Sequence, residues 1–249
     1  MIRKKKILIL IPSRLRSKRL ENKSIRMILR KPMIVRVVEQ AIKLKMGKVV
    51  VAAGDKKIKN LLDRYKIESY LSKKTHKSGT DRIYEIYKNF FGDYNIIVNL
   101  QGDMPYFEKE LVEKTVELLE CNKTDIGTAA CNLDEKDLKN PNVVKVKVNF
   151  RNNRGIAKDF TRKIKSIKQF YHHIGIYVFR PKSLTNFIMC KQSFNEKERS
   201  LEQMRALDND MIIKVSLLNS KPIGVDTKED LREIRIFLKD KKNKNQILQ

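Results

Sequence analysis

Short runs of β-branched residues alternate with segments of helical periodicity through the N-terminal part of this chain. Apolar runs at residues 6–11, 48–53 and 95–100 are predicted to be strands buried on both faces. Between them, apolar residues recur at helical spacing over residues 34–45 and 58–62. Parallel strands need crossover helices of this kind, so the alternation predicts an α/β fold with a mainly parallel, doubly wound sheet and helices on both faces.

The remainder of the chain continues with strands and helices in a less regular order. We expect strands at residues 125–132, 143–149, 156–162, 171–179 and 212–218, and helices at residues 83–91, 108–119, 182–189, 195–209 and 228–237. Pro12 is expected to end the first strand, and the polar tail at residues 240–249 is expected to fray. Because 41% of the 249 residues are hydrophobic, we predict a single domain over residues 1–239, with an excursion at about residues 150–180.

The formal net charge of +26 permits three kinds of anionic partner: nucleic acid, acidic membrane surfaces and small anions. The lysines are spread over the whole chain, aromatic residues make up only 7% of it, and it contains no Trp. A nucleic-acid-binding surface more often shows clustered cations or an aromatic motif. The diffuse excess of lysine is therefore more typical of a solvated surface, and we expect neither a nucleic-acid nor a membrane partner.

Cysteine usage and hydropathy indicate the compartment. The three cysteines, Cys121, Cys131 and Cys190, are scattered and lack metal-binding spacing, which fits reduced thiols in a cytoplasm. The longest apolar run, residues 7–11, is far shorter than the roughly 20 residues of a membrane-spanning helix. The charged start, MIRKKK, lacks the apolar core of a signal peptide. We therefore expect a soluble, cytoplasmic protein.

The strand at residues 95–100 is followed by Gln101, Gly102 and Asp103. In an open α/β sheet the ligand crevice lies outside the carboxyl ends of the strands, where Asp103 would reach a bound ion or a phosphate. Mg²⁺ takes one or two carboxylates and completes its shell with water and phosphate oxygens, which suits this position. Gly-Asp is also ordinary turn chemistry, so a plain solvated turn is the alternative.

A cationic loop follows the first strand. It carries five basic side chains within residues 13–23, namely Arg14, Arg16, Lys18, Arg19 and Lys23. These charges repel one another unless an anion lies among them, so a polyphosphate is a suitable ligand. A solvated basic loop is the alternative.

Two further segments carry polar residues at expected helix starts. Ser78 and Thr80 are natural N-caps before the helix at residues 83–91, and free N–H groups at a helix start attract anions. Arg82 would lie in the first turn, where the helix dipole disfavours a cation, which indicates a ligand there. Asp226 precedes the last helix, where the local pattern favours an N-cap or turn role.

The strand at residues 171–179 carries two adjacent histidines. His172 and His173 face opposite sides of a strand, so they cannot share a metal ion, and one of them is expected on the surface. His173, Gly175 and Tyr177 share one face, where they would form a small polar pocket wall. The alternative is that His173 and Tyr177 are half-buried strand residues with satisfied hydrogen bonds.

Taken in order, the polar motifs of the chain resemble those of the CMP-Kdo synthetases, the 3-deoxy-manno-octulosonate cytidylyltransferases. The matching segments are IPSRLRSKRLENK, RKPMIVRV, HKSGTDR, VNLQGDMP, NPNVVKV, FTR, HIGIY, LEQMRAL and GVDTKEDL. So many ordered matches make chance an inadequate explanation, although each alone is weak. The resemblance implies a Rossmann-like nucleotide-diphospho-sugar transferase fold with a small dimerisation excursion, and hence a homodimer.

The resemblance also implies a reaction and a set of site residues. An Mg²⁺-dependent nucleotidyltransferase would activate an acidic 2-keto sugar, Kdo or a close relative, with CTP to give the CMP-sugar and pyrophosphate. The implied nucleotide ligands are Arg14, Arg19, Lys23, Ser78, Gly79, Arg82 and Gln101. Asp103 and Asp226 would bind Mg²⁺ and act with Lys23 in catalysis. The acidic sugar would be held by Arg162, His173, Tyr177, Glu202 and Gln203.

The chain departs from the family pattern at several positions. Glu21 and Asn22 replace a Pro-Gly pair, Arg30 a Gly, Met104 a Glu and Lys228 a Pro, and residues 163–168, KIKSIK, replace an Ile-Pro-Trp segment. Met104 removes a carboxylate next to the metal position, and Arg30 lacks the backbone freedom of glycine. Because the triphosphate and metal positions survive, these changes bear mainly on the choice of sugar. Another acidic sugar, such as a nonulosonic acid, is therefore an alternative substrate. A basic nucleic-acid-binding protein on a degenerate transferase fold is the alternative of a different class.

Overall fold

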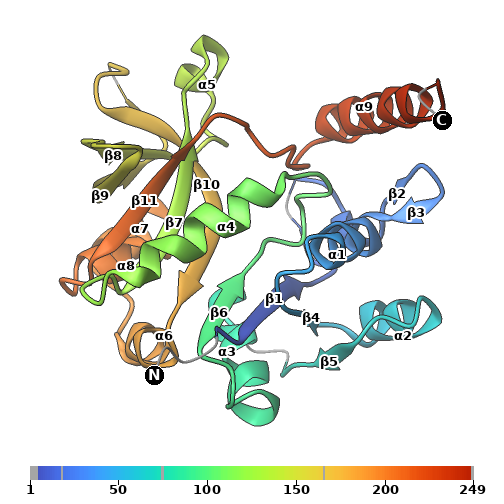
Figure 1. Cartoon of the computed structure of the whole chain (residues 1–249), viewed down its shortest axis with the longest axis horizontal. Helices are drawn as coiled ribbons and strands as arrows, with labels where there is room; N and C mark the ends of the chain where they lie inside the picture. Colours follow the sequence, from blue (N-terminus) through green and yellow to red (C-terminus); the bar gives the residue numbers. More distant parts are fainter. Residues whose placement is uncertain (1–4, 18, 74–75, 165, 248–249) are drawn as a thin grey trace. The chain divides into compact units, whose positions relative to one another are not determined.

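The computed structural model describes residues 5–17, 19–73, 76–164 and 166–247 of the chain (Figure 1). The chain divides into two compact units. The first unit comprises Met1–Leu8, Tyr87–Leu100 and Glu108–Lys221, and the second comprises Ile9–Ile86, Gln101–Phe107 and Pro222–Gln249. Each unit is thus assembled from three separate segments, and a single domain over residues 1–239 stays a prediction.

The first unit is built on a mixed sheet. Its strands are β6 (Ile96–Asn99), β7 (Ile126–Cys131), β8 (Lys145–Val148), β9 (Arg154–Thr161), β10 (Phe170–Phe179) and β11 (Ile213–Leu218), in the order β6-β10-β7-β11-β9-β8. β10 runs antiparallel to β6, β7 and β8, whereas β11 is parallel to β7. Because β8 pairs with both β9 and β10, the strands from β10 to β8 close into a ring. The parallel order predicted for the sheet therefore does not extend to this unit, where the long strand β10 returns antiparallel.

The first unit also contains helices, and one of them approaches the sheet closely at a glycine. The helices are α4 (Lys109–Glu117), η2 (Leu118–Glu120), α5 (Glu135–Lys139), α6 (Pro181–Met189), α7 (Phe194–Arg199) and α8 (Met204–Leu207). α4 contacts β7 and β11. A Cβ atom at Gly127 of β7 would lie 2.8 Å from the carbonyl oxygen of Thr115 in α4 and 2.5 Å from Val178 Cγ2. Glycine is thus what lets the helix approach the strand so closely.

The second unit holds the remaining strands and helices. They are β1 (Ile7–Ser13), which begins in the first unit, η1 (Lys23–Ile25), β2 (Met27–Ile28), β3 (Lys31–Pro32), α1 (Met33–Lys43), β4 (Lys48–Ala53), α2 (Lys56–Arg64), β5 (Ser69–Leu71), α3 (Gly79–Phe90), which ends in the first unit, and α9 (Lys228–Ile247). The strand order is β5-β4-β1, and β4 is parallel to β5 as the alternation predicts. α1 buries the apolar stripe Ile34, Val37, Val38 and Ala41. Near the C-terminus, Leu231 and Ile234 of α9 pack with Leu20, Ile28 and Met33 in one apolar cluster.

Several of the predicted bounds of strands and helices are wrong. β1 continues through Pro12 to Ser13, so the proline does not end the strand. The single helix expected at residues 195–209 is two short helices, because Ser200 takes a left-handed conformation with φ 52° and ends α7. The last helix does not stop at residue 237 but continues to Ile247, and α5 was not predicted at all. Among the described residues, none of the helices has both the length and the apolar composition needed to cross a bilayer.

Two positions at which the family pattern has glycine keep the backbone conformation that glycine favours. Asn22 has φ 54° and Arg30 has φ 66°. Asn visits this region at low cost, whereas for other L-residues the left-handed conformation costs roughly 1–2 kcal/mol. The turn at Leu29 and Arg30 is held by Arg36 of α1, whose Nη2 donates to the carbonyl oxygen of Leu29 at 2.6 Å. The chain therefore retains the turn geometry without the glycine.

Candidate functional site

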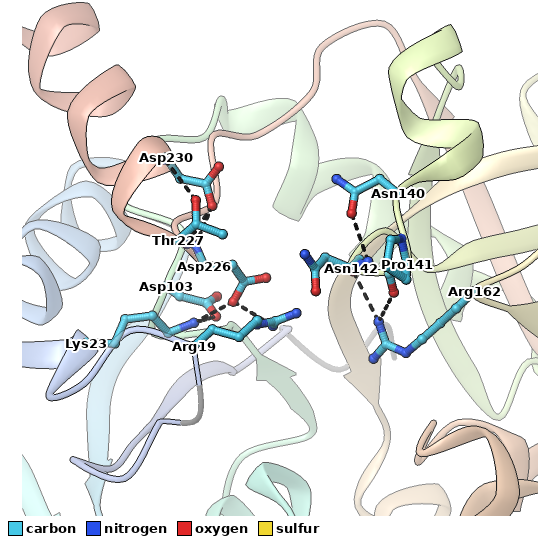
Figure 2. Close-up of polar contacts among 10 residues, drawn as sticks. All are labelled: Arg19, Lys23, Asp103, Asn140, Pro141, Asn142, Arg162, Asp226, Thr227 and Asp230. Carbon is cyan, nitrogen blue, oxygen red and sulfur yellow. Dashed lines mark hydrogen bonds and ion pairs between the residues drawn. The ribbon is translucent and has the colours of Figure 1, made fainter.

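Four charged side chains of the second unit form one cluster, shown in Figure 2. Lys23 Nζ lies 2.6 Å from Asp103 Oδ2 and 2.9 Å from Asp226 Oδ1. Arg19 Nη2 lies 2.8 Å from the same Asp226 Oδ1. One ammonium thus bridges two carboxylates that come from distant parts of the sequence, with a guanidinium beside them. Of the other cationic-loop residues, Lys18 lies outside the described residues.

Backbone contacts bring the two carboxylates together. The N–H of Val225 donates to the carbonyl oxygen of Asp103 at 2.9 Å, which joins the Gln-Gly-Asp turn to the segment before α9. A Cβ atom at Gly102 would lie 2.9 Å from the carbonyl oxygen of Pro12, so this turn passes β1 at a distance that only glycine tolerates. Met104, which follows Asp103, is buried with 5% of its surface exposed. The side chain that replaces the family's glutamate therefore packs inward.

Asp226 is not the N-cap of α9. Thr227 is the residue that caps the helix, because its Oγ1 accepts from the N–H of Asp230 at 3.1 Å while Asp230 Oδ2 accepts from the N–H of Thr227 at 2.8 Å. This reciprocal pair is a capping box. The Asp226 carboxylate instead contacts Lys23 and Arg19. The N-cap alternative for Asp226 is therefore wrong, and its carboxylate takes part in the cluster.

The cluster is partly buried, and its charges stabilise one another. The Lys23 side chain is 15% exposed, and those of Asp103 and Asp226 are 33% and 34% exposed. Burial alone would lower the pKa of Lys23, but the two carboxylates outweigh burial and raise it above its ordinary value. Burial alone would raise the pKa of Asp226, but the charges and hydrogen bonds of Lys23 and Arg19 outweigh it and lower that pKa. Lys23 and Asp226 are thus held in their charged forms.

The start of α3 carries three predicted nucleotide ligands. Ser78 is an N-cap as predicted, because its Oγ accepts from the N–H of Asp81 at 3.1 Å, whereas the N-cap prediction for Thr80 is wrong because α3 already begins at Gly79. A Cβ atom at Gly79 would lie 3.2 Å from Pro12 Cγ, so α3 starts close to the end of β1. Arg82 is buried, and its Nε donates to Ser72 Oγ at 3.0 Å. Burial, and then the charge of Arg14, lowers the pKa of Arg82.

Three further residues shape this region, and none of them was predicted as a site residue. Asp55 Oδ2 accepts from the backbone N–H of Leu15 at 2.8 Å, so it fixes the cationic loop next to the end of β4. A Cβ atom at Gly54 would lie 3.0 Å from the Arg82 guanidinium, and Ser72 receives the Arg82 hydrogen bond. The available signal was Gly-Asp after a buried strand, because Gly54 and Asp55 follow the strand at residues 48–53 much as Gly102 and Asp103 follow the strand at residues 95–100. Nothing local marks Ser72.

In the first unit, Arg162 follows β9 and donates through Nη1 to two backbone carbonyl oxygens. The distances are 3.0 Å to Pro141 and 3.1 Å to Asn142 (Figure 2). Arg162 also lines a cavity of about 780 Å³, together with Asp159, Thr161, Phe170 and Arg199. Arg162 therefore belongs to the wall of an open cavity, and its guanidinium is held by the loop at residues 140–142.

His173 lies in the interior of the first unit. It is 6% exposed, and its Nε2 lies 2.9 Å from Thr128 Oγ1 of β7. Burial, and then the neighbouring His172, lowers the pKa of His173 to about 3, so its ring is neutral at ordinary pH. His172 is also largely buried and its Nδ1 lies 2.8 Å from Asp137 Oδ2, so the expectation that one of the two histidines would be plain surface is wrong.

Tyr177 lies next to His173, with ring centroids 5.6 Å apart. The two residues come together despite an irregularity in strand pairing, because β10 shifts register against β7 between Ile174 and Tyr177. Tyr177 is 6% exposed, and burial followed by the charge of Glu202 raises the pKa of its phenol well above 10. Glu202 lies in the turn between α7 and α8 with Gln203, which is 4% exposed.

The structure thus groups the predicted residues into two sets within separate units. In the second unit Arg19, Lys23, Asp103 and Asp226 are in direct contact. In the first unit His173 and Tyr177 are in contact, and the charge of Glu202 acts on Tyr177. The ligand roles of Arg14, Ser78, Gly79, Arg82, Gln101, Arg162 and Gln203 stay predictions.

Comparisons with known proteins show both the class of enzyme and the family to which this chain belongs. The family model described as cytidylyltransferase matches residues 8–214, which makes the chain a nucleotidyltransferase. Over 237 residues it is 39% identical to the 3-deoxy-manno-octulosonate cytidylyltransferase of Bartonella henselae, covering 93% of this chain and 98% of that protein. The chain therefore belongs to the 3-deoxy-manno-octulosonate cytidylyltransferase family, as its motifs predict.

Solved structures agree with this assignment. A structure of CMP:2-keto-3-deoxy-manno-octonic acid synthetase complexed with CTP has a TM-score of 0.85 and 29% sequence identity, covering 95% of this chain and 99% of that one. A second structure, described as a putative glucose-1-phosphate thymidylyltransferase from Bacillus anthracis, has a TM-score of 0.67 and 16% sequence identity, covering 93% of this chain and 94% of that one. At this identity the likeness shows a shared fold alone. The predicted nucleotidyltransferase fold class is confirmed.

Proposed function

We propose that this chain transfers the cytidylyl group of CTP to an acidic 2-keto sugar, Kdo or a close relative, and releases pyrophosphate. The observation that carries the proposal is the cluster of Lys23, Asp103, Asp226 and Arg19, in which cations and carboxylates meet within hydrogen-bonding distance. A triphosphate with a bound metal ion requires both signs of charge at one place. The names of relatives in the same family support CTP and Kdo as the two substrates.

Asp103 and Asp226 would hold Mg²⁺. The Lys23 ammonium lies 2.6 Å from Asp103 Oδ2 and 2.9 Å from Asp226 Oδ1. Both carboxylates therefore point toward one cation. Two carboxylates suit Mg²⁺, which prefers to take its other ligands from water and substrate phosphates. When bound, Mg²⁺ would neutralise phosphate charge and ease deprotonation of the attacking hydroxyl.

The cationic side chains would bind and orient the nucleotide. Lys23 and Arg19 would exchange part of their contact with the carboxylates for contact with the triphosphate, since phosphate oxygens are strong acceptors for both groups. The anomeric hydroxyl of the sugar would then attack the α-phosphorus in line with the departing pyrophosphate. This scheme requires no covalent enzyme intermediate, so the side chains contribute positioning and charge stabilisation.

The first-unit residues would recognise the sugar without transferring protons. Arg162 offers a guanidinium suited to a sugar carboxylate. His173 is neutral because burial lowers its pKa to about 3, and Tyr177 keeps its proton because burial raises its pKa. Groups whose pKa values lie so far from neutrality are poor acid–base catalysts at neutral pH. Their roles would be hydrogen bonding and shape.

Pyrophosphate release tests the proposal. The purified chain is incubated with Mg²⁺, CTP and a panel of acidic sugars that includes Kdo and a nonulosonic acid. We expect release with Kdo or a close relative, and none when ATP replaces CTP or when a chelator removes Mg²⁺. Release only with the nonulosonic acid would reassign the sugar. An absence of release with every sugar would overturn the proposal, and strongly salt-dependent affinity for DNA or RNA without CTP binding would then favour a nucleic-acid-binding protein.

We further propose that the chain works as a homodimer in the cytoplasm. The family resemblance supports the dimer, and the free thiols of Cys121, Cys131 and Cys190 support a reducing compartment. Light scattering over a range of protein concentrations measures the mass in solution. A mass of one chain throughout that range would contradict the dimer.

A further inference from the structure

Lys145 is a fully buried cation to which the proposed reaction gives no role. It begins β8, where it pairs with Thr161 of β9 and His172 of β10, and its relative exposure is 0%. Its ammonium makes no ion pair with any residue that the structure describes, and the nearby carboxylate of Asp137 is hydrogen-bonded to His172 and Lys221 instead. Lys145 Nζ donates to the carbonyl oxygens of Asn140 and Arg162, both at 2.8 Å.

Burying an ammonium without a carboxylate costs stability. Burial lowers the pKa of Lys145, which is the expected response of a cation held by neutral acceptors. Methionine has a similar length and would fill the same space without the desolvation cost. Two carbonyl acceptors at 2.8 Å are therefore the feature that distinguishes lysine from an apolar residue at this position.

One of those acceptors belongs to Arg162, which is thereby held at both ends. Lys145 binds its backbone carbonyl oxygen, while its guanidinium donates to the carbonyl oxygens of Pro141 and Asn142 (Figure 2). The same loop is tied to Lys145 through the carbonyl oxygen of Asn140, and Asn140 Oδ1 accepts from the N–H of Asn142 at 2.9 Å. Lys145, the loop and Arg162 therefore form a closed set of contacts.

We propose that Lys145 is a positioning residue that fixes Arg162 for recognition of the acidic sugar. The inference rests on the proposed function for the identity of that ligand. Lys145 does not touch the sugar; it holds the backbone from which the Arg162 side chain extends and the loop that receives the guanidinium. A guanidinium fixed in advance loses less freedom on binding a carboxylate than one on a free loop.

A double-mutant cycle tests this role. We compare the wild type, Lys145→Met, Arg162→Gln and the double variant, measuring KM for the sugar, KM for CTP and kcat in each. Lys145→Met is expected to raise KM for the sugar about tenfold and to leave KM for CTP unchanged. In the Arg162→Gln background the same substitution should have little further effect, because Lys145 acts through Arg162. Lys158→Met, an exposed lysine of β9, is the matched control and should behave as the wild type.

Equal effects of Lys145→Met in both backgrounds would overturn the proposal, as would an equal loss toward CTP and the sugar. If Lys145→Met does not fold, Lys145→Gln replaces it, because its amide keeps a donor but shortens its reach. The cycle is then run with that variant and the same expectations.

An observation that needs no turnover separates this inference from the proposed function. In NMR spectra of protein labelled with ¹⁵N-arginine, the Arg162 guanidinium of the wild type should give an ordered, exchange-protected signal. Lys145→Met should remove that protection, and Lys158→Met should keep it. Unchanged protection in Lys145→Met would overturn the positioning role even if CTP is turned over. Lost protection together with no turnover of any sugar would support the positioning role and overturn only the proposed function.

Discussion

The charged cluster of the second unit and the polar interior of the first unit satisfy their polar groups by different means. Lys23, Asp103 and Asp226 are partly exposed, and each is compensated by opposite charge. His173 and Tyr177 are almost fully buried and uncharged, and the one hydrogen bond described for the His173 ring joins Nε2 to Thr128 Oγ1. Burial shifts the pKa of His173 down and that of Tyr177 up, in each case toward the neutral form.

This difference predicts different responses in the two regions. A cluster held by charge can exchange partners, because a phosphate or a metal ion can replace a side chain as the counter-charge. A neutral, close-packed interior cannot exchange partners without opening, so it offers a fixed shape instead. The first arrangement suits a ligand that brings several charges, and the second suits discrimination among similar sugars.

The largest effect is expected for Asp226→Asn. Loss of this carboxylate should lower kcat by about a thousandfold or more, roughly 4 kcal/mol, because an amide is a poor Mg²⁺ ligand and a weak partner for Lys23. The fold should persist, since Thr227 and Asp230 keep the helix cap. Steady-state kinetics and thermal unfolding measure the two outcomes.

Asp63→Asn provides the control for that variant. Asp63 is an exposed carboxylate of α2 that pairs with Lys59, so the same chemical change there should leave both kcat and Tm close to the wild type. If Asp226→Asn keeps its turnover, the Asp226 carboxylate is not needed for catalysis and the prediction is wrong. A large fall in Tm would show instead that the cluster is needed for folding.

An intermediate effect is expected in the pH dependence of stability. The pKa of His173 is about 3 in the folded chain and roughly 6.5 when unfolded, so between these values the unfolded state binds the extra proton. Its stabilising contribution is present above pH ~6.5 and is lost on acidification, by up to about 1.4 kcal/mol per pH unit. Asp226, whose folded pKa is lowered, loses its contribution only below its unfolded value of about 3.9.

Urea unfolding at pH 7, 6 and 5 separates these windows. The free energy of unfolding of the wild type should fall more steeply with acidification than that of His173→Gln, whose amide also offers a donor to Thr128. Both proteins keep His172, whose pKa burial also lowers, so its contribution cancels in the difference. Parallel curves for the two proteins would show that His173 is protonated in the folded state without cost.

Strand ends and motif residues were predictable from sequence, whereas their partners through space were not. Gln-Gly-Asp after a buried strand marked Asp103, and ordered motifs added Lys23 and Asp226. Thr128 carried no local signal, and Lys145 lies in the motif NPNVVKV without a role that its sequence reveals, because the roles of both residues depend on which strand lies beside them. Thr128 reaches His173 because β7 pairs with β10, and Lys145 reaches the backbone of Arg162 because β8 pairs with β9.

The errors in the predicted elements have similar causes. The charged run at residues 195–209 has good helical propensity, but it is interrupted at Ser200, and Arg205 turns back to form a bidentate pair with Glu196 at 2.8 Å and 2.6 Å. Both side chains are almost fully buried, so this tertiary contact accompanies the break that places Glu202 and Gln203 in a turn. Local propensity contains no information about such a pair.

The smallest effect is expected for Tyr177→Phe, which removes one hydroxyl and keeps the ring that packs 5.6 Å from His173. If the phenol donates to the sugar, KM for the sugar should rise by the value of one hydrogen bond, ~0.5–1.5 kcal/mol, while KM for CTP stays constant. Tyr171→Phe is the control on the same strand, because its ring packs on Phe150, and it should leave both KM values unchanged. Equal increases toward both substrates in Tyr177→Phe would indicate damaged packing instead. An increase confined to the sugar would mean that the neutral interior of the first unit, unlike the charged cluster, contributes to substrate choice through single, oriented hydrogen bonds.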